Sequence, residues 1–321
     1  MPVPTINNPI TSSEEIIEAA RTLAHNDRRR MVSVAGAQDG AVMSALAQSN
    51  ADGILDATLF GDKVKIEEIS AKEQIDISKL DIIHESDALK ATYGAVKMAA
   101  EGHADIVMKG FVSTSALLKT VLAKEFNLRT KNTISHCAVL DIPGYDKLLS
   151  MTDGGMVVQP DRDQKRQILE NAVYVSKALG ITPVKVAVSG AVDKVFDDIP
   201  ASKEAAEFVR EMQAKNYPGV EIDGPLAFDS ATSKEIAAKK KLDGPVAGQA
   251  DIYLVSSIEE CNIIAKALIN FIDAVFAGVI VGARVPVSLV SRTDTITNKK
   301  ASVSIACLLA AYYEQTGGFD K

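Results

Sequence analysis

The sequence contains no tryptophan, only three cysteines and few aromatic residues, which make up 5% of its 321 positions. The cysteines are Cys137, Cys261 and Cys307, and no two of them stand in a Cys-x-x-Cys spacing. This pattern predicts neither a zinc site nor a redox pair, so we expect no bound metal. An odd, sparse set of thiols is typical of a reduced, cytoplasmic protein rather than of a disulfide framework.

Long apolar runs and a signal-peptide pattern are also missing. The segment 274–283 is the most apolar candidate, but it has only about half of the residues that a membrane-spanning helix needs. The N-terminal residues lack a basic segment followed by an apolar one, so no signal peptide is predicted. The net charge of −7 argues against a general nucleic-acid-binding protein. We therefore expect neither a membrane nor a nucleic acid among the partners.

Short apolar, β-branched runs alternate with helical patterns along the chain. Examples are MVSVAGA (31–37), ADIVMKG (104–110) and AVFAGVIVG (274–282), and turn residues follow each run. Strands separated by helices of this kind predict an α/β protein with mostly parallel sheets. The nearly continuous apolar character of the strands indicates that helices cover both sheet faces. The strands are too numerous for one sheet of usual size, so we expect two α/β/α domains.

Polar residues that follow strands are the first candidates for a site, because parallel sheets bind ligands beyond the carboxyl ends of their strands. After the run 104–110, Ser113 or Thr114 can cap the next helix, whose N-terminus can bind an anion. The alternative is a plain helix cap. The run 286–290 is followed by Ser-Arg-Thr-Asp at 291–294, for which the alternative is a solvated loop with a local ion pair.

Five segments carry a resemblance to a known family. They are ADIVMKGFVSTSALLKTVL (104–122), LRTKNTISHCAVLDIPGYDKLLSMTDGG (128–155), DGPLAFDSA (223–231), GPVAGQADIYLVSSIEECN (244–262) and VIVGARVPVSLVSRTD (279–294). With these segments, over nearly its whole length, the chain resembles phosphate acyltransferases of the phosphotransacetylase and phosphotransbutyrylase family. Its motifs are closer to those of the butyryl branch.

The resemblance implies an enzyme that interconverts acyl-CoA and inorganic phosphate with acyl phosphate and CoA, without a permanently bound cofactor. It also implies a homodimer and a fold similar to the isocitrate and isopropylmalate dehydrogenases, with the active site in the cleft between two domains. In that fold the C-terminal segment rejoins the first domain. We therefore predict a discontinuous first domain, 1–134 plus 282–321, and a second domain, 135–281.

The resemblance places Ser291 and Arg292 at the reaction centre. Acyl transfer between a thiol and phosphate needs a base for the thiol, donors for an oxyanion and a cation for phosphate. We expect Ser291 to donate a hydrogen bond near the thioester carbonyl and Arg292 to stabilise the transition-state charge. Because CoA supplies its own thiol nucleophile, no cysteine of the chain needs to be catalytic.

The base is the point at which this sequence departs from the acetyl branch. There an aspartate follows the arginine by six positions, whereas this chain has Asn298. Asp294 is the nearest carboxylate and the predicted base, with a loop carboxylate paired with Arg292 or Lys299 as the alternative. A histidine base at His136 is a further possibility, but we expect a structural, hydrogen-bonded histidine there.

The remaining predicted site residues bind substrate. The resemblance assigns Arg129 to phosphate or CoA, with a solvated side chain as the alternative, and Lys109, Ser113 and Thr114 are weaker phosphate candidates by position. In the second domain the predicted ligands of CoA or phosphate are Thr152, Asp153, Asn262 and Lys266. Asp153 can instead cap a turn with the two glycines that follow it. Lys266 would replace an arginine that acetyl-branch members carry where this chain has Ile269.

Two other functions remain open. A nicotinamide-dependent dehydrogenase of the same fold needs a divalent-metal cluster of aspartates, and the sequence shows no such cluster near a strand end and no Gly-x-Gly-x-x-Gly motif. A non-catalytic acyl-CoA-binding protein is the second alternative, and Asn298 keeps it open. Neither the acyl chain length nor a dimer interface follows from the sequence.

Overall fold

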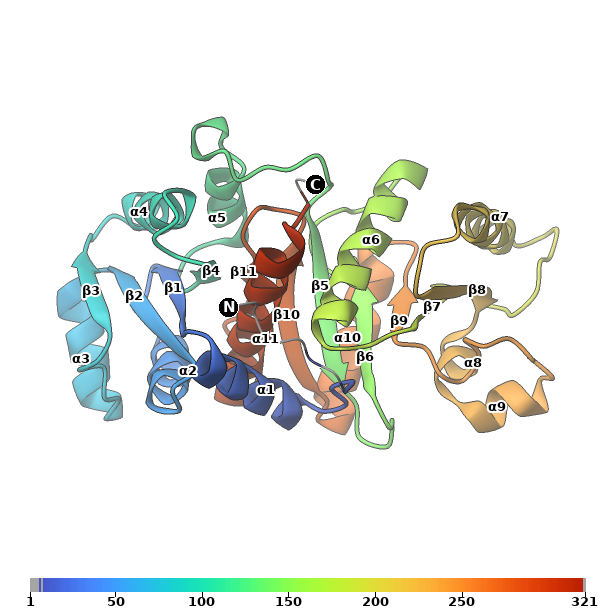
Figure 1. The fold of residues 1–321 in the computed structure, drawn as a ribbon, viewed down its shortest axis with the longest axis horizontal. Helices are drawn as coiled ribbons and strands as arrows, with labels where there is room; N and C mark the ends of the chain where they lie inside the picture. The colour runs from blue at the N-terminus through green and yellow to red at the C-terminus, as the bar shows by residue number, and fades with distance from the viewer. Residues whose placement is uncertain (1–5, 7, 320–321) are drawn as a thin grey trace. The chain divides into compact units, whose positions relative to one another are not determined.

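The computed structural model describes residue 6 and residues 8–319, which divide into two compact units (Figure 1). The first unit contains residues 13–132 and 276–319, and the second contains residues 6, 8–12 and 133–275. Compared with the predicted domains, residues 276–281 lie with the first unit, whereas residues 6, 8–12 and 133–134 lie with the second. The predicted domain bounds stay a prediction, because compactness alone does not show that a segment folds independently.

The first unit is a mostly parallel sheet with the strand order β3-β2-β1-β4-β11-β10, in which only β10 and β11 are antiparallel. The strands are β1 (Arg30–Ala35), β2 (Leu55–Gly61), β3 (Asp81–His84), β4 (Ile106–Lys109), β10 (Val275–Val281) and β11 (Val287–Ser288). The helices are α1 (Ser13–Asn26), α2 (Gly40–Ala51), α3 (Lys63–Glu73), α4 (Ala88–Ala100), α5 (Thr114–Val121) and α11 (Ile296–Thr316), with a 3₁₀ turn at Lys124–Phe126.

The second unit has the strand order β5-β6-β9-β7-β8, with β5 and β6 antiparallel and the other neighbours parallel. The strands are β5 (Ser135–Asp141), β6 (Leu148–Thr152), β7 (Val184–Ser189), β8 (Val220–Leu226) and β9 (Ile252–Leu254). The helices are α6 (Arg162–Ala178), α7 (Pro200–Lys215), α8 (Phe228–Thr232), α9 (Lys234–Lys239) and α10 (Ile258–Ile272). The predicted fold class, two α/β units with mostly parallel sheets, is confirmed.

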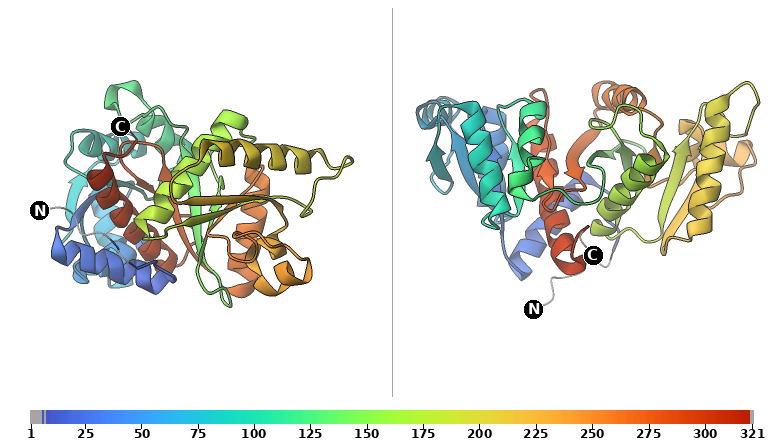
Figure 2. Two further views of the ribbon diagram at one scale, coloured as in Figure 1. Left: turned by 45° about the vertical axis from the view of Figure 1, so that its right-hand side comes forward. Right: turned by 90° about the horizontal axis from the view of Figure 1, so that it is seen from above.

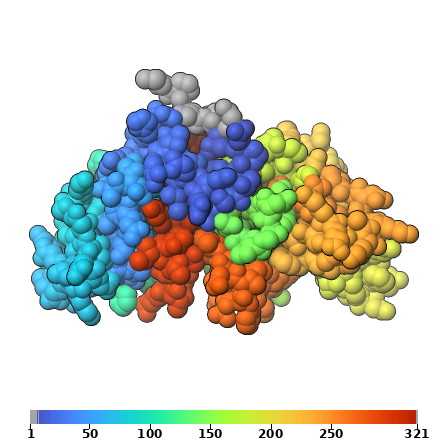
Figure 3. All heavy atoms as spheres, turned by 90° about the horizontal axis from the view of Figure 1, so that it is seen from below, coloured from blue at the N-terminus to red at the C-terminus, as the bar shows by residue number. Residues whose placement is uncertain are grey.

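Helices cover both faces of the first unit's sheet, as the continuous apolar strands predict. Helices α4 and α5 pack together on one face, while α1, α2 and α11 pack together on the other (Figure 2). Connections between parallel strands are right-handed, so the direction in which a connection crosses the sheet decides which face its helix covers. Connections run in both directions in this sheet, which places helices on both faces. Helix α1 lies at the surface of this unit (Figure 3).

Helix α11 is the central helix of the first unit. It has 21 residues, of which 14 are buried, and its small alanine and serine side chains allow close packing. Thr295 caps it by accepting a hydrogen bond from the Asn298 N–H at 3.1 Å, so the helix begins directly after residues 291–294. None of the helices in the described part of the chain combines the length and apolar character needed to cross a membrane.

The turns after β1 and β4 approach each other very closely. The Gly110 N–H donates to the Ala35 carbonyl at 2.9 Å, and Gly36 has a φ of +70°. A Cβ atom at residue 110 would lie 2.2 Å from the Gly36 carbonyl oxygen. Only glycine fits at residue 110, and this approach fixes the strand end that carries Lys109.

The Gly110→Ala variant tests this close approach. The added methyl group must displace backbone, so we expect the free energy of unfolding to fall by about 1–3 kcal/mol. Gly155→Ala is the matched control, because its Cβ would have no contact nearer than 3.4 Å. Urea unfolding is followed by circular dichroism, since the chain has no tryptophan. Parent-like stability of Gly110→Ala would show that the two turns separate easily.

Candidate active site

The loop at residues 291–294 is folded back on itself by short hydrogen bonds. The Ser291 N–H donates to the Asp294 carboxylate at 2.6 Å, and the Asp294 N–H donates to the Ser291 carbonyl at 3.3 Å. The hydroxyl groups of Ser291 and Thr293 lie 3.1 Å apart. The Lys299 ammonium donates to the carbonyls of Ser291, at 2.9 Å, and Asp294, at 2.7 Å. The side chains of Ser291 and Arg292 remain exposed at the tip of this loop.

Arg292 lies on an aromatic ring. Its guanidinium carbon is 4.6 Å from the ring centroid of Phe111, which follows β4 and is 47% exposed. A guanidinium held over a ring face by cation–π attraction keeps N–H groups available to other acceptors. Arg292 can therefore offer several N–H donors to a phosphate or carbonyl oxygen while it stays in contact with Phe111.

Lys109 brings a second cation to the same strand ends. It is the last residue of β4 and 6% exposed, and its ammonium makes long hydrogen bonds to the carbonyls of Gly110, at 3.3 Å, and Val290, at 3.4 Å. Burial lowers the pKa of Lys109, and the nearby positive charge of Arg292 lowers it further.

Lys109 and the four charged groups that act on it carry one more positive than negative charge. The cations of Arg292 and Lys299 disfavour its charged form, whereas the carboxylates of Asp39 and Asp294 favour it. Three cations therefore face two carboxylates, and Asp39 is already engaged as the N-cap of α2, where it accepts from the Val42 N–H at 2.9 Å. An anion that enters this end of the sheet meets a positive field.

Asp294, the predicted base, is a partly buried carboxylate of the same loop. Burial raises the pKa of its carboxyl group, which makes the carboxylate a better proton acceptor than an exposed aspartate. In the described part of the chain one carboxylate oxygen accepts from the Ser291 N–H, and Lys299 bonds the Asp294 carbonyl instead of its carboxylate. The described residues show no hydrogen bond from Lys299 or Arg292 to this carboxylate, although the charge of Lys299 lowers its pKa.

Asn298 has a structural position in the first turn of α11. It is buried, its N–H meets the Thr295 cap, and its side-chain oxygen accepts from the Phe276 N–H at the start of β10, at 3.3 Å. The amide thus ties the helix to the neighbouring strand. This contact gives the residue a role that does not depend on proton transfer.

Three further predicted residues lie elsewhere in the first unit. Ser113 is the N-cap of α5 and accepts from the Ala116 N–H at 3.1 Å, so the predicted helix cap is present there. Thr114 is the first residue of that helix. Arg129 is exposed and its backbone pairs with Ala283, while its side chain shows no hydrogen bond or ion pair with the other described residues.

The second unit carries the predicted residues Thr152 and Asp153 at the end of β6. The Thr152 hydroxyl donates to the His136 carbonyl at 3.0 Å. The Asp153 carboxylate accepts four backbone N–H groups, from His136, Gly155, Met156 and Val157, at 2.8–3.2 Å. Burial raises the Asp153 pKa even though these donors oppose the shift. The turn-capping alternative for Asp153 is therefore the one that its contacts show.

Asn262 joins this turn from helix α10. Its side-chain amide donates to the Gly154 carbonyl at 2.7 Å, and a Cβ atom at Gly154 would lie 2.9 Å from the Cys261 sulfur. Burial raises the pKa of the Cys261 thiol, which keeps it protonated and unreactive. Lys266 is exposed one turn further along α10. The structure thus brings Asp153 and Asn262 to the turn that follows Thr152, and Lys266 lies on the same face of α10 as Asn262.

His136 lies inside β5 and is 6% exposed. Burial lowers the pKa of its imidazole from 6.5 to about 4, so the ring is neutral at physiological pH. A base must accept a proton at working pH, and a ring with this pKa is poorly suited to that role. The structural interpretation of His136 is the one that its burial supports.

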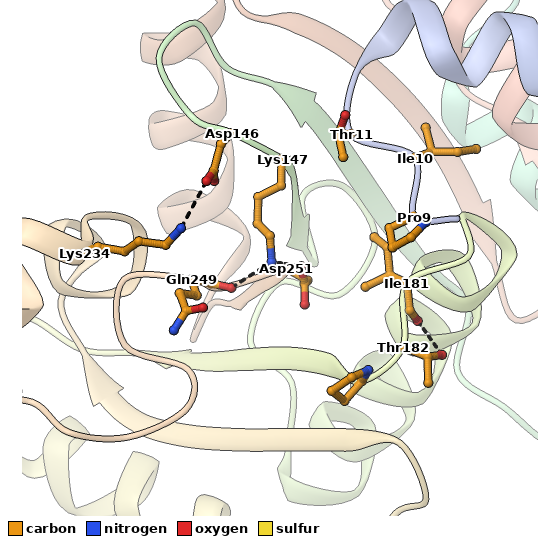
Figure 4. A pocket seen from close by; sticks show the side chains of 11 residues that line it. Pro9, Ile10, Thr11, Asp146, Lys147, Ile181, Thr182, Lys234, Gln249 and Asp251 are labelled. Carbon is orange, nitrogen blue, oxygen red and sulfur yellow. Dashed lines mark hydrogen bonds and ion pairs between the residues drawn. The ribbon is translucent and has the colours of Figure 1, made fainter. Parts of the chain in front are cut away.

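A pocket of about 260 Å³ in the second unit lies at the amino ends of β6, β7 and β9 (Figure 4). Lys147 donates to the Asp251 carboxylate at 2.5 Å, and Lys234 pairs with Asp146 at 3.1 Å. Its lining includes no predicted site residue, since Thr152 lies at the opposite end of β6. Because these charges are paired, the pocket offers no net positive charge to a phosphate.

Comparisons with known proteins show which proteins this chain is similar to. A family model described as "Phosphate acetyl/butaryl transferase" matches residues 84–307. A phosphate butyryltransferase of Clostridium beijerinckii is 40% identical over 282 residues, 88% of this chain and 93% of that protein. A phosphate acetyltransferase of Rhizobium meliloti is 36% identical over 259 residues, 81% and 82% of the two chains. A solved branched-chain phosphotransacylase of Enterococcus faecalis is 30% identical with a TM-score of 0.77, covering 88% of this chain and 99% of that one.

The pKa of His136 predicts a pH-dependent stability. Between pH 6.5 and about 4 the unfolded chain binds a proton at this ring and the folded chain does not. We therefore expect His136 to lower the free energy of unfolding by up to about 1.4 kcal/mol for each pH unit of acidification in that window.

Imidazole NMR resonances followed between pH 8 and 4 measure the pKa of His136 in the folded protein directly. The exposed ring of His103 is the control, and its resonance is assigned with the His103→Gln variant. An imidazole of His136 that protonates near pH 6.5 would contradict the expected burial effect and reopen the histidine as a candidate base.

Proposed function

We propose a specific reaction for this chain, which belongs to the phosphate acetyl/butaryl transferase family and is an acyltransferase. The reaction is the reversible transfer of a short-chain, butyryl-like acyl group between CoA and inorganic phosphate. It proceeds by direct attack in a ternary complex and needs no permanently bound cofactor. The observation that carries the proposal is the cluster formed by Lys109, Ser291, Arg292 and Asp294 at the carboxyl ends of β4 and β11.

In the direction of acyl phosphate, a phosphate oxygen attacks the thioester carbonyl carbon and forms a C–O bond. The carbonyl oxygen becomes an oxyanion, and the C–S bond then breaks as the carbonyl reforms. The attacking hydrogen phosphate gives its proton to the Asp294 carboxylate, which passes it to the departing CoA thiolate. In the reverse direction Asp294 removes the thiol proton, the thiolate attacks the acyl phosphate carbonyl, and the bond to phosphate breaks.

The cations of the cluster suit both charged species in this reaction. The exposed edge of Arg292 can bind phosphate or the oxyanion with two parallel N–H bonds. Lys109 adds a point charge that is desolvated and therefore strong at short range. The Ser291 hydroxyl, at the tip of the same loop, is a donor for the oxyanion.

The remaining predicted residues are proposed to bind the substrates. Arg129 has an exposed, unengaged guanidinium among the described residues, which supports a role with the phosphates of CoA. Ser113 and Thr114 open helix α5 and are proposed to bind an anion through that helix start. In the second unit, Lys266 is an exposed cation, whereas Thr152, Asp153 and Asn262 shape the turn that CoA would meet.

Butyryl-like acyl groups are the proposed preference, with acetyl as the second choice. The motifs of the butyryl branch and the 40% identity to a phosphate butyryltransferase support this order. Each methylene group in an apolar pocket changes discrimination by only about 1–3 kcal/mol, so relatives of both kinds are expected to accept neighbouring chain lengths. We also propose a cytoplasmic homodimer, and the exposed apolar Phe271 of α10 is consistent with a subunit contact.

A thiol-release assay tests the proposed function. Purified protein is mixed with phosphate and a series of acyl-CoAs from acetyl to octanoyl, and free CoA is followed. Phosphate-dependent release, greatest with butyryl-CoA, supports the proposal, and a maximum with acetyl-CoA supports the second choice. A protein that binds CoA but releases none with any substrate would favour a non-catalytic acyl-CoA-binding protein instead.

Arg292→Ala is expected to lower turnover far more than it weakens CoA binding. The guanidinium acts on charge that develops in the transition state, so kcat should fall by roughly 100- to 1,000-fold while KM for acyl-CoA changes little. Arg292→Lys keeps the charge but loses the fork, and we expect an intermediate turnover. Steady-state kinetics measure kcat and KM for the parent and both variants, and a parent-like kcat in Arg292→Ala would refute the assigned role.

Asp294→Asn separates a base from a structural carboxylate. As a base, Asp294 is needed to ionise the thiol, so the variant should lose most activity and recover part of it as pH approaches the thiol pKa of about 8.5. Stability should not fall at pH 7. Burial raises the Asp294 pKa, so its charged form destabilises the folded state above the ordinary value of 3.8, and the neutral amide removes that cost.

Rates and unfolding curves at several pH values check both parts of this expectation. An Asp294→Asn enzyme that is less stable than its parent at pH 7, yet turns over at the parent rate once folded, would show a structural carboxylate.

A further inference from the structure

Lys299 is a buried cation next to the reaction-centre loop. Its side chain is 0% exposed, and it lies in the first turn of α11, four residues after the Thr295 cap. Among the described residues its ammonium has two hydrogen-bond partners, the backbone carbonyls of Ser291 and Asp294. A lysine in a polar first helical turn normally reaches solvent, so this position needs an explanation.

Two physical effects make Lys299 a poor choice for stability alone. Removing an ammonium group from water is costly unless a carboxylate or several good acceptors replace the solvent. The N-terminal end of a helix carries a partial positive charge, which repels a cation in its first turn. A neutral apolar residue of similar length would avoid both costs, so stability alone does not explain a lysine at this position.

The neighbouring lysine shows the usual arrangement. Lys300 is partly exposed and pairs with the Asp52 carboxylate at 2.5 Å, which is the ordinary role of a lysine on this helix. Lys299, one position earlier, turns instead toward the loop and bonds two carbonyls that lie three residues apart. Both lysines belong to α11, but Lys300 pairs with a carboxylate, whereas Lys299 bonds backbone carbonyls.

We propose that Lys299 is a positioning residue for the acyl transfer, an inference that rests on the function proposed above. Its ammonium fixes the two ends of the loop, since Ser291 and Asp294 each give it a carbonyl. With both ends fixed, the Ser291 N–H stays on the Asp294 carboxylate and the intervening Arg292 is directed onto Phe111. Lys299 does not contact the reacting atoms in this account; it acts through the loop.

Lys299→Met and Lys300→Met form a matched pair that tests the role. Methionine has a similar length and suits a buried site, so both variants should fold. We expect Lys299→Met to lower kcat by about 10- to 100-fold with KM for acyl-CoA within about threefold, because a misplaced reaction centre slows the chemistry more than binding. Lys300→Met should stay within about twofold of the parent. Lys299→Arg, which keeps the donors, should recover part of the lost kcat.

Amide hydrogen exchange gives a readout that does not depend on catalysis. Loss of the two carbonyl contacts should speed exchange at residues 291–294 by about tenfold or more in Lys299→Met and leave it unchanged in Lys300→Met. Faster loop exchange in Lys299→Met, together with a parent protein that shows no turnover, would place the error in the proposed function and keep the positioning contact. Parent-like kcat and parent-like loop exchange in Lys299→Met would overturn the inference.

Discussion

The proposed acyl transfer depends on cations that are kept away from water near the carboxyl ends of the strands in the first unit. Lys109 and Lys299 are 6% and 0% exposed, and among the described residues backbone carbonyls accept their hydrogen bonds. A desolvated cation whose neighbours do not neutralise it attracts an anion strongly. In the proposed reaction, phosphate and the developing oxyanion supply negative charge near Lys109 and Arg292, whereas Lys299 acts only through the loop at residues 291–294.

The backbone around these cations is fixed by residues that take no part in the proposed reaction. The close approach of Gly36 and Gly110 sets the end of β4, and the Thr295 cap sets the start of α11. Hydrogen bonds within residues 291–294 then determine where the arginine points. Because each of these contacts is short and local, small changes in backbone position become changes in the direction of charged side chains.

Part of this site could be predicted from the sequence because it follows a local rule. The end of an apolar strand marks Ser291 and Asp294, and the alternation of runs correctly predicts two α/β units. Lys299 and Phe111 could not be predicted in this way. The burial of a lysine and the stacking of a ring on Arg292 depend on β4 and β11 lying side by side, which a linear pattern does not contain.

The central claim is that the protein contributes charge and position, and not a covalent nucleophile, to acyl transfer. The most direct measurement is the exchange of isotopically labelled CoA into butyryl-CoA, with and without phosphate. Direct attack in a ternary complex predicts no exchange in phosphate-free buffer and rapid exchange once phosphate is added. Exchange without phosphate would require an acyl-enzyme intermediate and would contradict the account.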